Sequence, residues 1–170
     1  NNNKFYPLIV IPKSYRNSFS PDIYSDGNVL LYSNKLMKLE NINIDVKGTV
    51  EMISNKKFKQ IGGSLECNKI GIKAPNIYHV PNGNCSPKID ANELIHVGKT
   101  HIISPEMKIG IYHQFGGLNV ESKVLTDTFF KYKEEGKVTT HVMTTKQSII
   151  PSKIMINQAY FHSDTKLKGV

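Results

Sequence analysis

Short runs in which apolar and polar residues alternate, separated by turn-forming residues, recur along most of the chain. Alternation with a period of two predicts strands with one buried face. Besides the paired runs described in the next paragraph, this pattern predicts strands at 42–46, 64–73, 93–97, 100–103, 108–113 and 118–125. Composition supports this, because Ile, Val and Thr supply 40 residues and Ala only three. Such a chain is rich in strand formers and poor in helix formers, so the pattern predicts an all-β protein.

Three pairs of strand-like runs are joined by short polar segments typical of hairpins. Asp26-Gly27-Asn28 separates 23–25 from 29–32, and Asp-Gly tolerates the positive φ angles of tight hairpin turns. The other two pairs are 50–53 with 58–61, and 126–132 with 138–142. Regularly spaced hairpins predict an antiparallel sandwich or barrel.

The sequence also contains an approximate internal repeat. Residues 41–49 align with 92–100 at an offset of 51, and Gln60-Ile61-Gly62-Gly63 aligns with Gln114-Phe115-Gly116-Gly117. We therefore expect one domain over 1–170, with candidate repeat units near 39–80 and 89–132. A repeat of this length fits two β units packed face to face or pairs of coils in a β-solenoid. The hairpin signals favour the first, and the β-solenoid is the alternative.

Length and charge exclude some functional classes. The chain has 170 residues, and no segment approaches the roughly 18 consecutive apolar residues of a membrane-spanning helix. The formal charge of +8 comes from 21 Lys and one Arg. Bidentate recognition of bases needs Arg far more than Lys, so sequence-specific binding of nucleic acid is not expected. Lys56, Lys57 and Lys59 form the densest cationic group and are the candidate residues for contact with polyanions.

Two cysteines, Cys67 and Cys85, enclose a segment that ends in a turn-rich stretch. Neither has a second ligand at zinc-site spacing, so we expect no metal and no cofactor. A Cys67–Cys85 disulfide is the preferred interpretation, with two reduced thiols as the alternative. Because disulfides persist in oxidising compartments, this predicts a secreted, periplasmic or cell-surface protein.

Candidate catalytic residues are densest between 90 and 113. Asp90, Glu93, His96, His101 and His113 have the side chains used in acid–base chemistry, but they follow no recognised catalytic spacing. His96 and His101 are five residues apart, which on one strand places them on opposite faces. Exposed strand and loop side chains are the simpler interpretation of this group.

These observations favour a non-enzymatic binding module that acts at the cell surface or outside the cell, such as an envelope, adhesin-like or host-directed protein. Its expected partner is a protein or a glycan. The alternatives are a secreted hydrolase or lyase acting on a polymer, and binding of polyanions by lysines. A groove that gathers two or more of the five candidate residues would favour the enzyme. Oligomeric state cannot be read from the sequence.

Overall fold

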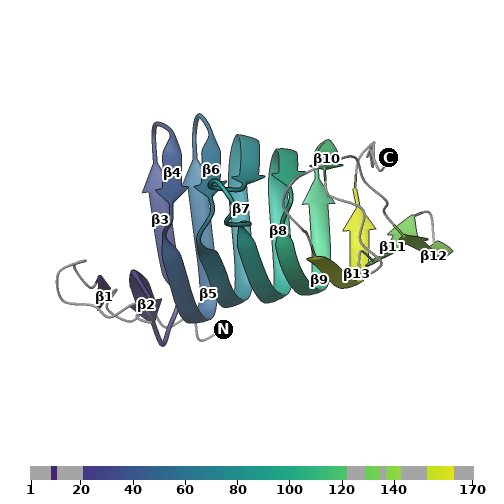
Figure 1. Ribbon diagram of the computed structural model, residues 1–170, viewed down its shortest axis with the longest axis horizontal. Helices are drawn as coiled ribbons and strands as arrows, with labels where there is room; N and C mark the ends of the chain where they lie inside the picture. Colours follow the sequence, from purple (N-terminus) through teal and green to yellow (C-terminus); the bar gives the residue numbers. More distant parts are fainter. Residues whose placement is uncertain (1–8, 11–20, 122–128, 135–136, 143–152, 163–170) are drawn as a thin grey trace.

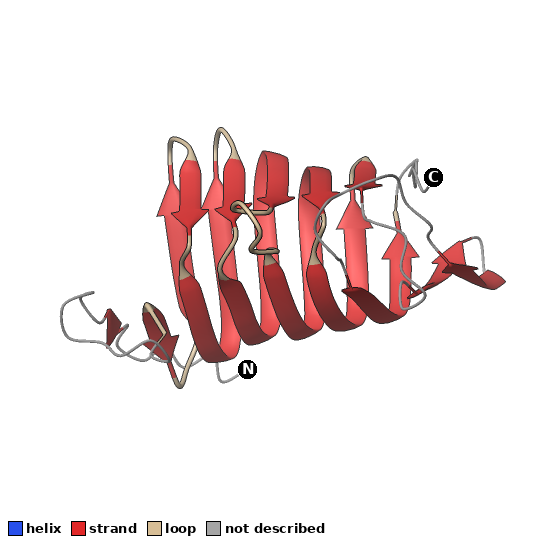
Figure 2. Ribbon diagram, viewed as in Figure 1, coloured by secondary structure: helices blue, strands red, loops and turns tan. Residues whose placement is uncertain are grey.

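The chain forms a parallel β-solenoid of about five turns, in which each turn lies against the next. The structure is a computed structural model that describes residues 9–10, 21–121, 129–134, 137–142 and 153–162, with side chains over 21–121 and 154–162. The described elements are all strands (Figure 2). Figure 1 shows them stacked side by side along the length of the molecule, from β2 and β3 to β9 and β13.

Each turn contains three strand segments separated by bends. In chain order the turns are built from β2 (Ile23–Ser25), β3 (Val29–Ser33) and β4 (Met37–Glu40); β5 (Asn43–Ser54) and β6 (Phe58–Ile61); β7 (Ser64–Val80); β8 (Lys88–Ile103); and β9 (Glu106–Phe115) and β10 (Leu118–Glu121). β7 and β8 are bent strands that cover all three segments of their turns, since they pair with the separate strands of the neighbouring turns.

The three segments of successive turns stack into three parallel ladders, which we call sides A, B and C. Side A comprises 23–25, 43–46, 64–67, 88–91, 106–109 and 153–156; side B comprises 29–33, 49–53, 69–73, 93–97, 111–115 and 158–161; side C comprises 37–40, 58–61, 76–80, 99–103 and 118–121. On each side, alternate residues point into the solenoid and outward.

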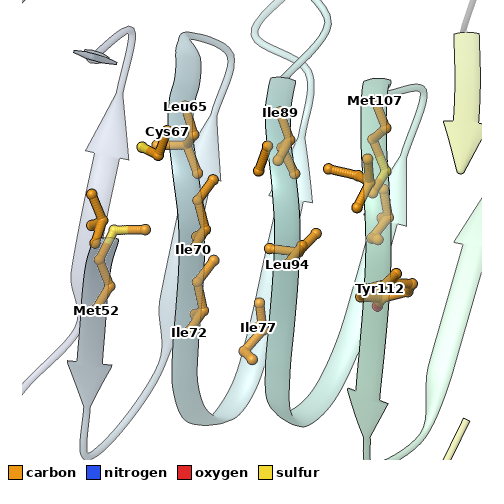
Figure 3. Packing of buried hydrophobic residues seen from close by; sticks show 14 of the residues in the cluster. Met52, Leu65, Cys67, Ile70, Ile72, Ile77, Ile89, Leu94, Met107 and Tyr112 are labelled. Atoms are coloured by element: carbon orange, nitrogen blue, oxygen red, sulfur yellow. The ribbon is translucent and has the colours of Figure 1, made fainter. Parts of the chain in front are cut away.

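The hydrophobic core runs along the inside of the ladders (Figure 3). Because the strands are parallel and in register, inward residues of successive turns lie in columns. One column on side A is Ile44, Leu65, Ile89, Met107 and Ile154, each no more than 3% exposed. A turn cannot bury its inward side chains alone, so its stability comes from the turns on either side.

The corner between sides C and A has the same left-handed backbone conformation in three turns, although the residue type there differs. Asn41 (φ 52°), Gly62 (φ 60°) and Ser104 (φ 45°) all adopt the left-handed conformation there. Asn tolerates this conformation better than most residues and Gly adopts it without strain. A left-handed residue redirects the chain from one ladder to the start of the next turn.

The antiparallel sandwich or barrel predicted from the sequence is therefore wrong, and the β-solenoid alternative describes the chain. β2 and β3 flank Asp26-Gly27-Asn28 but do not pair with each other, since both pair in parallel with β5. β5 and β6 likewise pair with β7 and not with each other. The turn residues bend the chain as expected, but the strands that follow hydrogen-bond to another turn.

The structural repeat is the solenoid turn. Ile44 pairs with Leu65, Leu65 with Ile89 and Ile89 with Met107. The number of residues from one paired position to the next is the length of a turn, and it differs among these three turns. The turn that includes the β7–β8 loop is the longest of them. Gly62-Gly63 lies between sides C and A, whereas Gly116-Gly117 lies between sides B and C. The two glycine pairs thus occupy different corners, and a duplication of units 39–80 and 89–132 stays a prediction.

Further strands extend the ladder at both ends. β1 (Ile9–Val10) pairs antiparallel with β2, and β13 (Lys153–Phe161) pairs in parallel with β9. β11 (Phe129–Glu134) pairs in parallel with β13 and antiparallel with β12 (Lys137–Val142). This last pair confirms the antiparallel pairing of the third predicted hairpin over 129–132 and 138–142, while 126–128 lie outside the described residues. Added strands pair with main-chain groups that would otherwise form an open edge.

Replacement of Gly98 by Ala tests the bend between sides B and C. Gly98 has φ 140°, and a Cβ there would lie 1.8 Å from the main-chain oxygen of Ala74. We expect Gly98→Ala to lower the free energy of unfolding by more than about 2 kcal/mol, measured by urea denaturation. Gly71→Ala is the matched control, because no atom lies nearer than 4.0 Å to its added Cβ. Equal stability of the two variants would contradict the close packing of turns at this bend.

Candidate functional site

The five candidate residues between 90 and 113 are distributed over the whole cross-section of the solenoid. Asp90 points outward from side A, Glu93 and His113 lie on the outer surface of side B, and His101 lies outside side C. His96 points inward and is fully buried. Only Glu93 and His113 share an outer surface, and Glu93 is also paired with Lys69 (3.7 Å). The expected placement of His96 and His101 on opposite faces agrees with the structure.

The predicted Cys67–Cys85 disulfide is absent, and both thiols are free. Cys67 points into side A between Val46 and Ala91 and is 8% exposed (Figure 3). Cys85 is exposed on the loop between β7 and β8, where its backbone pairs with Asn82. One cysteine belongs to the core and the other to an outer loop. Burial raises the pKa of Cys67 to about 12, so its thiol is not a nucleophile near neutral pH.

A chain of polar side chains crosses the interior between sides C and B, and of its members only His96 is among the candidates predicted from the sequence. His79 Nδ1 lies 2.6 Å from Gln60 Oε1, and His79 Nε2 lies 3.0 Å from His96 Nε2. His96 Nδ1 is 2.8 Å from the Tyr112 hydroxyl, which donates to Gln114 Oε1. We call these five residues the buried network. All five side chains have 0% exposure, and each is hydrogen-bonded, as buried polar groups in proteins generally are.

The two ends of the buried network are held by main-chain oxygens. Gln60 Nε2 donates to the Lys88 carbonyl (3.1 Å), and Gln114 Nε2 donates to the Gly98 carbonyl (3.0 Å) and to Thr100 Oγ1 (3.1 Å). Burial holds the pKa of His79 well below 6.5 and lowers that of His96 to about 3. Both imidazoles are therefore neutral in the folded protein at physiological pH. Solvent does not reach these imidazoles, because both side chains are fully buried.

The outer surface of side A is charged. Asp45, Glu66 and Asp90 follow one another in register on successive turns, which places them about 4.8 Å apart along the ladder. Asp45 is paired with Lys47 (3.2 Å), and Lys88 with Glu106 (3.4 Å) on the neighbouring positions. A depression of about 720 Å³ between this side and the β7–β8 loop includes Asp45 and Glu66. The sequence could not show this column, because its members lie a full turn apart along the chain.

The outer surface of side B carries most of the exposed apolar side chains of the described residues, with charged residues among them. Tyr160 stacks on His113 with ring centres 5.0 Å apart, and Phe115 stacks on His162 at 4.1 Å. His113 Nδ1 also lies 3.0 Å from His162 Nε2, and partial burial with the nearby His162 lowers the pKa of His113. Because the rings stack along the solenoid axis, their faces are turned toward one another and their edges toward solvent. This arrangement leaves little open ring face for stacking of a sugar.

A hollow interrupts side B where Gly71 has no side chain. Its volume is about 280 Å³, and it is lined by Ile53, Ile95 and Val97 with the polar side chains of Glu51, Lys69 and Lys73 around it. Gly71 pairs in register with Glu51 on one turn and Ile95 on the next, so the hollow lies between larger neighbours in the same column. An apolar floor with charged residues at its margin is the usual form of an anchor pocket at a protein interface.

The lysines of the sequence-predicted cationic group lie on or beside side C. Lys59 points outward from β6, with Lys57 at its start and Lys56 at the adjacent corner. Lys57 Nζ and Lys59 Nζ lie 5.4 Å and 5.7 Å from the centre of the Tyr78 ring. Two of the three lysines, Lys57 and Lys59, thus share an aromatic neighbour that comes from the next turn.

Comparison with protein-family models, curated proteins and solved structures finds no match to this chain. Within the described ranges, no three His, Cys, Asp or Glu side chains are grouped so as to hold a metal ion. The same residues include no helix of the length and apolarity needed to cross a membrane.

The positions of the cysteines predict their reactivity. Native protein treated with iodoacetamide is expected to gain one modification, at Cys85, and a second only in denaturant, because Cys67 is buried and its pKa is raised. Mass spectrometry of intact and digested protein measures this directly. Failure of both cysteines to react in denaturant without reductant would show that a disulfide is present after all.

The buried histidines predict a loss of stability in mild acid. An unfolded histidine has a pKa near 6.5, whereas that of folded His96 is about 3, so the unfolded chain binds more protons below pH 6.5. Stability is complete above about pH 7.5 and falls as the pH decreases from 6.5 toward 3. By pH 5, His96 alone removes about 2 kcal/mol, and His79 acts in the same direction.

Urea denaturation at pH 7.5 and 5.0 measures this loss, and ¹⁵N shifts of the imidazoles report their charge. His101→Gln, at an outer position, is the control variant and is expected to keep the same pH dependence. Titration of His79 and His96 near pH 6.5 in the folded protein would contradict the assignment.

Proposed function

We propose that this chain is a non-enzymatic binding module that contacts a protein partner through the outer surface of side B. The observation that carries the proposal is the position of its exposed apolar side chains. Among the described residues, seven large hydrophobic side chains are strongly exposed, and five of them, Leu30, Tyr32, Val97, Ile111 and Phe115, lie on side B. A concentration of exposed apolar surface on one face is a feature of interaction sites.

The chemistry of side B supports a protein as the partner in preference to a neutral glycan. The stacked rings of His113, Phe115, Tyr160 and His162 present mainly their edges, which leaves little open ring face for a sugar within this group. The hollow at Gly71 is large enough for one apolar side chain. We therefore propose a partner that inserts an apolar anchor at Gly71, with acidic residues placed to meet Lys73 at the margin.

The size of side B limits what it binds alone. Six strand segments spaced about 4.8 Å apart and about five residues long give roughly 400 Å² on this side. A typical stable interface buries about 800 Å² on each partner. A flat pairing of two copies through this side would be weak, so binding through side B depends on an inserted anchor.

Other sequence-based hypotheses stay predictions. An extracellular or periplasmic location was inferred mainly from the disulfide, which the chain does not form. The polymer-degrading enzyme would need its acid–base residues in one groove, whereas the five candidates are spread over three sides and the interior. The column of Asp45, Glu66 and Asp90 does bring several carboxylates close together, as acid–base cleavage of a polymer requires.

The proposal is tested with displayed random peptides selected on the immobilised protein. We expect enriched sequences to share an aromatic or large aliphatic residue flanked by acidic residues. Gly71→Leu places an apolar side chain in the hollow, its Cβ has no atom nearer than 4.0 Å, and it should reduce binding of these peptides at least about tenfold.

A matched pair of substitutions separates side B from general effects. Phe115 on side B and Met155 on side A are 41% and 44% exposed, so Phe115→Asp and Met155→Asp remove similar apolar surface. Phe115→Asp should weaken binding and Met155→Asp should not. Peptides that bind all variants equally, or that lose binding only to Met155→Asp, would overturn the proposal, as would wild-type protein that sediments as a stable dimer blocked by Phe115→Asp.

A further inference from the structure

We propose that side C is a second binding surface, independent of side B, and that it binds a linear acidic polysaccharide. The proposal starts from the register of the ladder. Lys38, Lys59, Tyr78, His101 and Asn119 are paired in succession on five consecutive turns, all on strands of side C. Their inward neighbours, such as Phe58, Ile77 and Ile102, are buried, so these five side chains point outward along one line.

A parallel line of residues adds further positive charge. Phe58 is paired with Ile77, so the residues directly before them, Lys57 and Asn76, lie at matching positions on neighbouring turns. Asn76 is in turn paired with Lys99 on the following turn. Lys57, Lys59 and Lys99 have no ion pair within the described parts of the chain, whereas Lys38 is paired with Glu40 (3.2 Å). The acidic residues on the outside of side C are Glu40 and Glu121, one at each end of the surface. The centre of side C is therefore positively charged.

The other two sides lack this character. On side A the lysines alternate with Asp45, Glu66, Asp90 and Glu106, and two of them are ion-paired. On side B, Lys69 is paired with Glu93, and Lys73 is the one lysine of that side without an ion pair among the described residues, beside Ile53 and Val97. A polyanion would meet carboxylates on side A and apolar side chains on side B. Side C is the surface of the described solenoid where a negatively charged polymer meets several unneutralised ammonium groups.

The aromatic contacts on side C favour a polyanion without bases. The Tyr78 ring is stacked on His101, with centres 5.2 Å apart and planes at 9°, and the Lys57 and Lys59 ammonium groups approach from the preceding turn. His101 is in turn followed by Asn119, whose Nδ2 lies 3.5 Å from His101 Nδ1. Both ring faces of Tyr78 are thus occupied. Binding of single-stranded nucleic acid relies on open aromatic faces, which this surface does not provide.

The shape of side C suits an extended polymer. Its cationic groups are carried by turns of a regular ladder, spaced about 4.8 Å apart, and not by a closed pocket. Lysine contributes a hydrated point charge without fixed geometry, which matches carboxylate or sulfate groups repeated along a flexible chain. The Tyr78 ring holds two lysine side chains in place by cation–π contact, which reduces the entropy lost on binding.

The test measures affinity for heparin, a sulfated polysaccharide, at several salt concentrations. Lys57→Gln with Lys59→Gln removes two charges from side C, and Lys88→Gln with Lys108→Gln removes two from side A, so the variants have equal net charge. We expect the side C variant to lose about tenfold or more in affinity, and the slope of log K against log salt to fall by about two. The side A variant should stay close to wild type.

Folding of each variant is checked by its urea midpoint, so that a loss of affinity is not a loss of structure. If both double variants lose the same affinity for heparin, only net charge matters, and the assignment of the binding surface to side C is wrong. Absence of heparin binding at low salt, or tighter binding of oligo-dT than of heparin, would overturn the choice of ligand. Because Phe115→Asp leaves side C intact, it should bind heparin normally, which separates this proposal from the function proposed for side B.

Discussion

The whole architecture depends on main-chain hydrogen bonds that join each turn to the next in register. Once Ile44 is paired with Leu65 and Leu65 with Ile89, the other residues of side A in those turns have their inward or outward direction fixed. Differences in turn length are absorbed at bends and corners, as in the loop between β7 and β8, and not within the ladders. Buried columns and outer lines of like side chains both follow from this pairing, and so do the three chemically different sides.

Strand content could be predicted from the sequence, but strand pairing could not. Alternation identified segments such as 64–73 and 93–97 correctly, because it reflects burial of one face regardless of partner. Asp26-Gly27-Asn28 has the same local conformational signal whether the chain reverses into a hairpin or bends toward the next side. The deciding contacts are made with β5, a full turn further along the chain, where a local pattern carries no information. The unequal lengths of the turns further hide the period.

The same limits explain the candidate sites. His79 and His96 each follow a buried apolar residue at the alternate position, Ile77 and Leu94, so parity alone could have placed both histidines inside. Their contact with each other depends on how sides B and C meet across the interior, which the sequence does not show. The hollow at Gly71 and the line through Lys59, Tyr78 and His101 likewise arise only when turns of unequal length are brought into register.

The buried network has one hydrogen fewer than it has contacts between polar atoms. Four contacts connect Gln60 Oε1 to Gln114 Oε1 through His79, His96 and Tyr112, and both end atoms are oxygens that only accept. Two neutral imidazoles and one phenol supply three hydrogens for these four contacts. The amides cannot supply the fourth, because their nitrogens already donate to the Lys88 and Gly98 carbonyls. A proton would complete the set, but it would bring an unpaired charge into a fully buried site. Hydrogen stoichiometry therefore restricts which side chains these five positions accept, in addition to the space available to them.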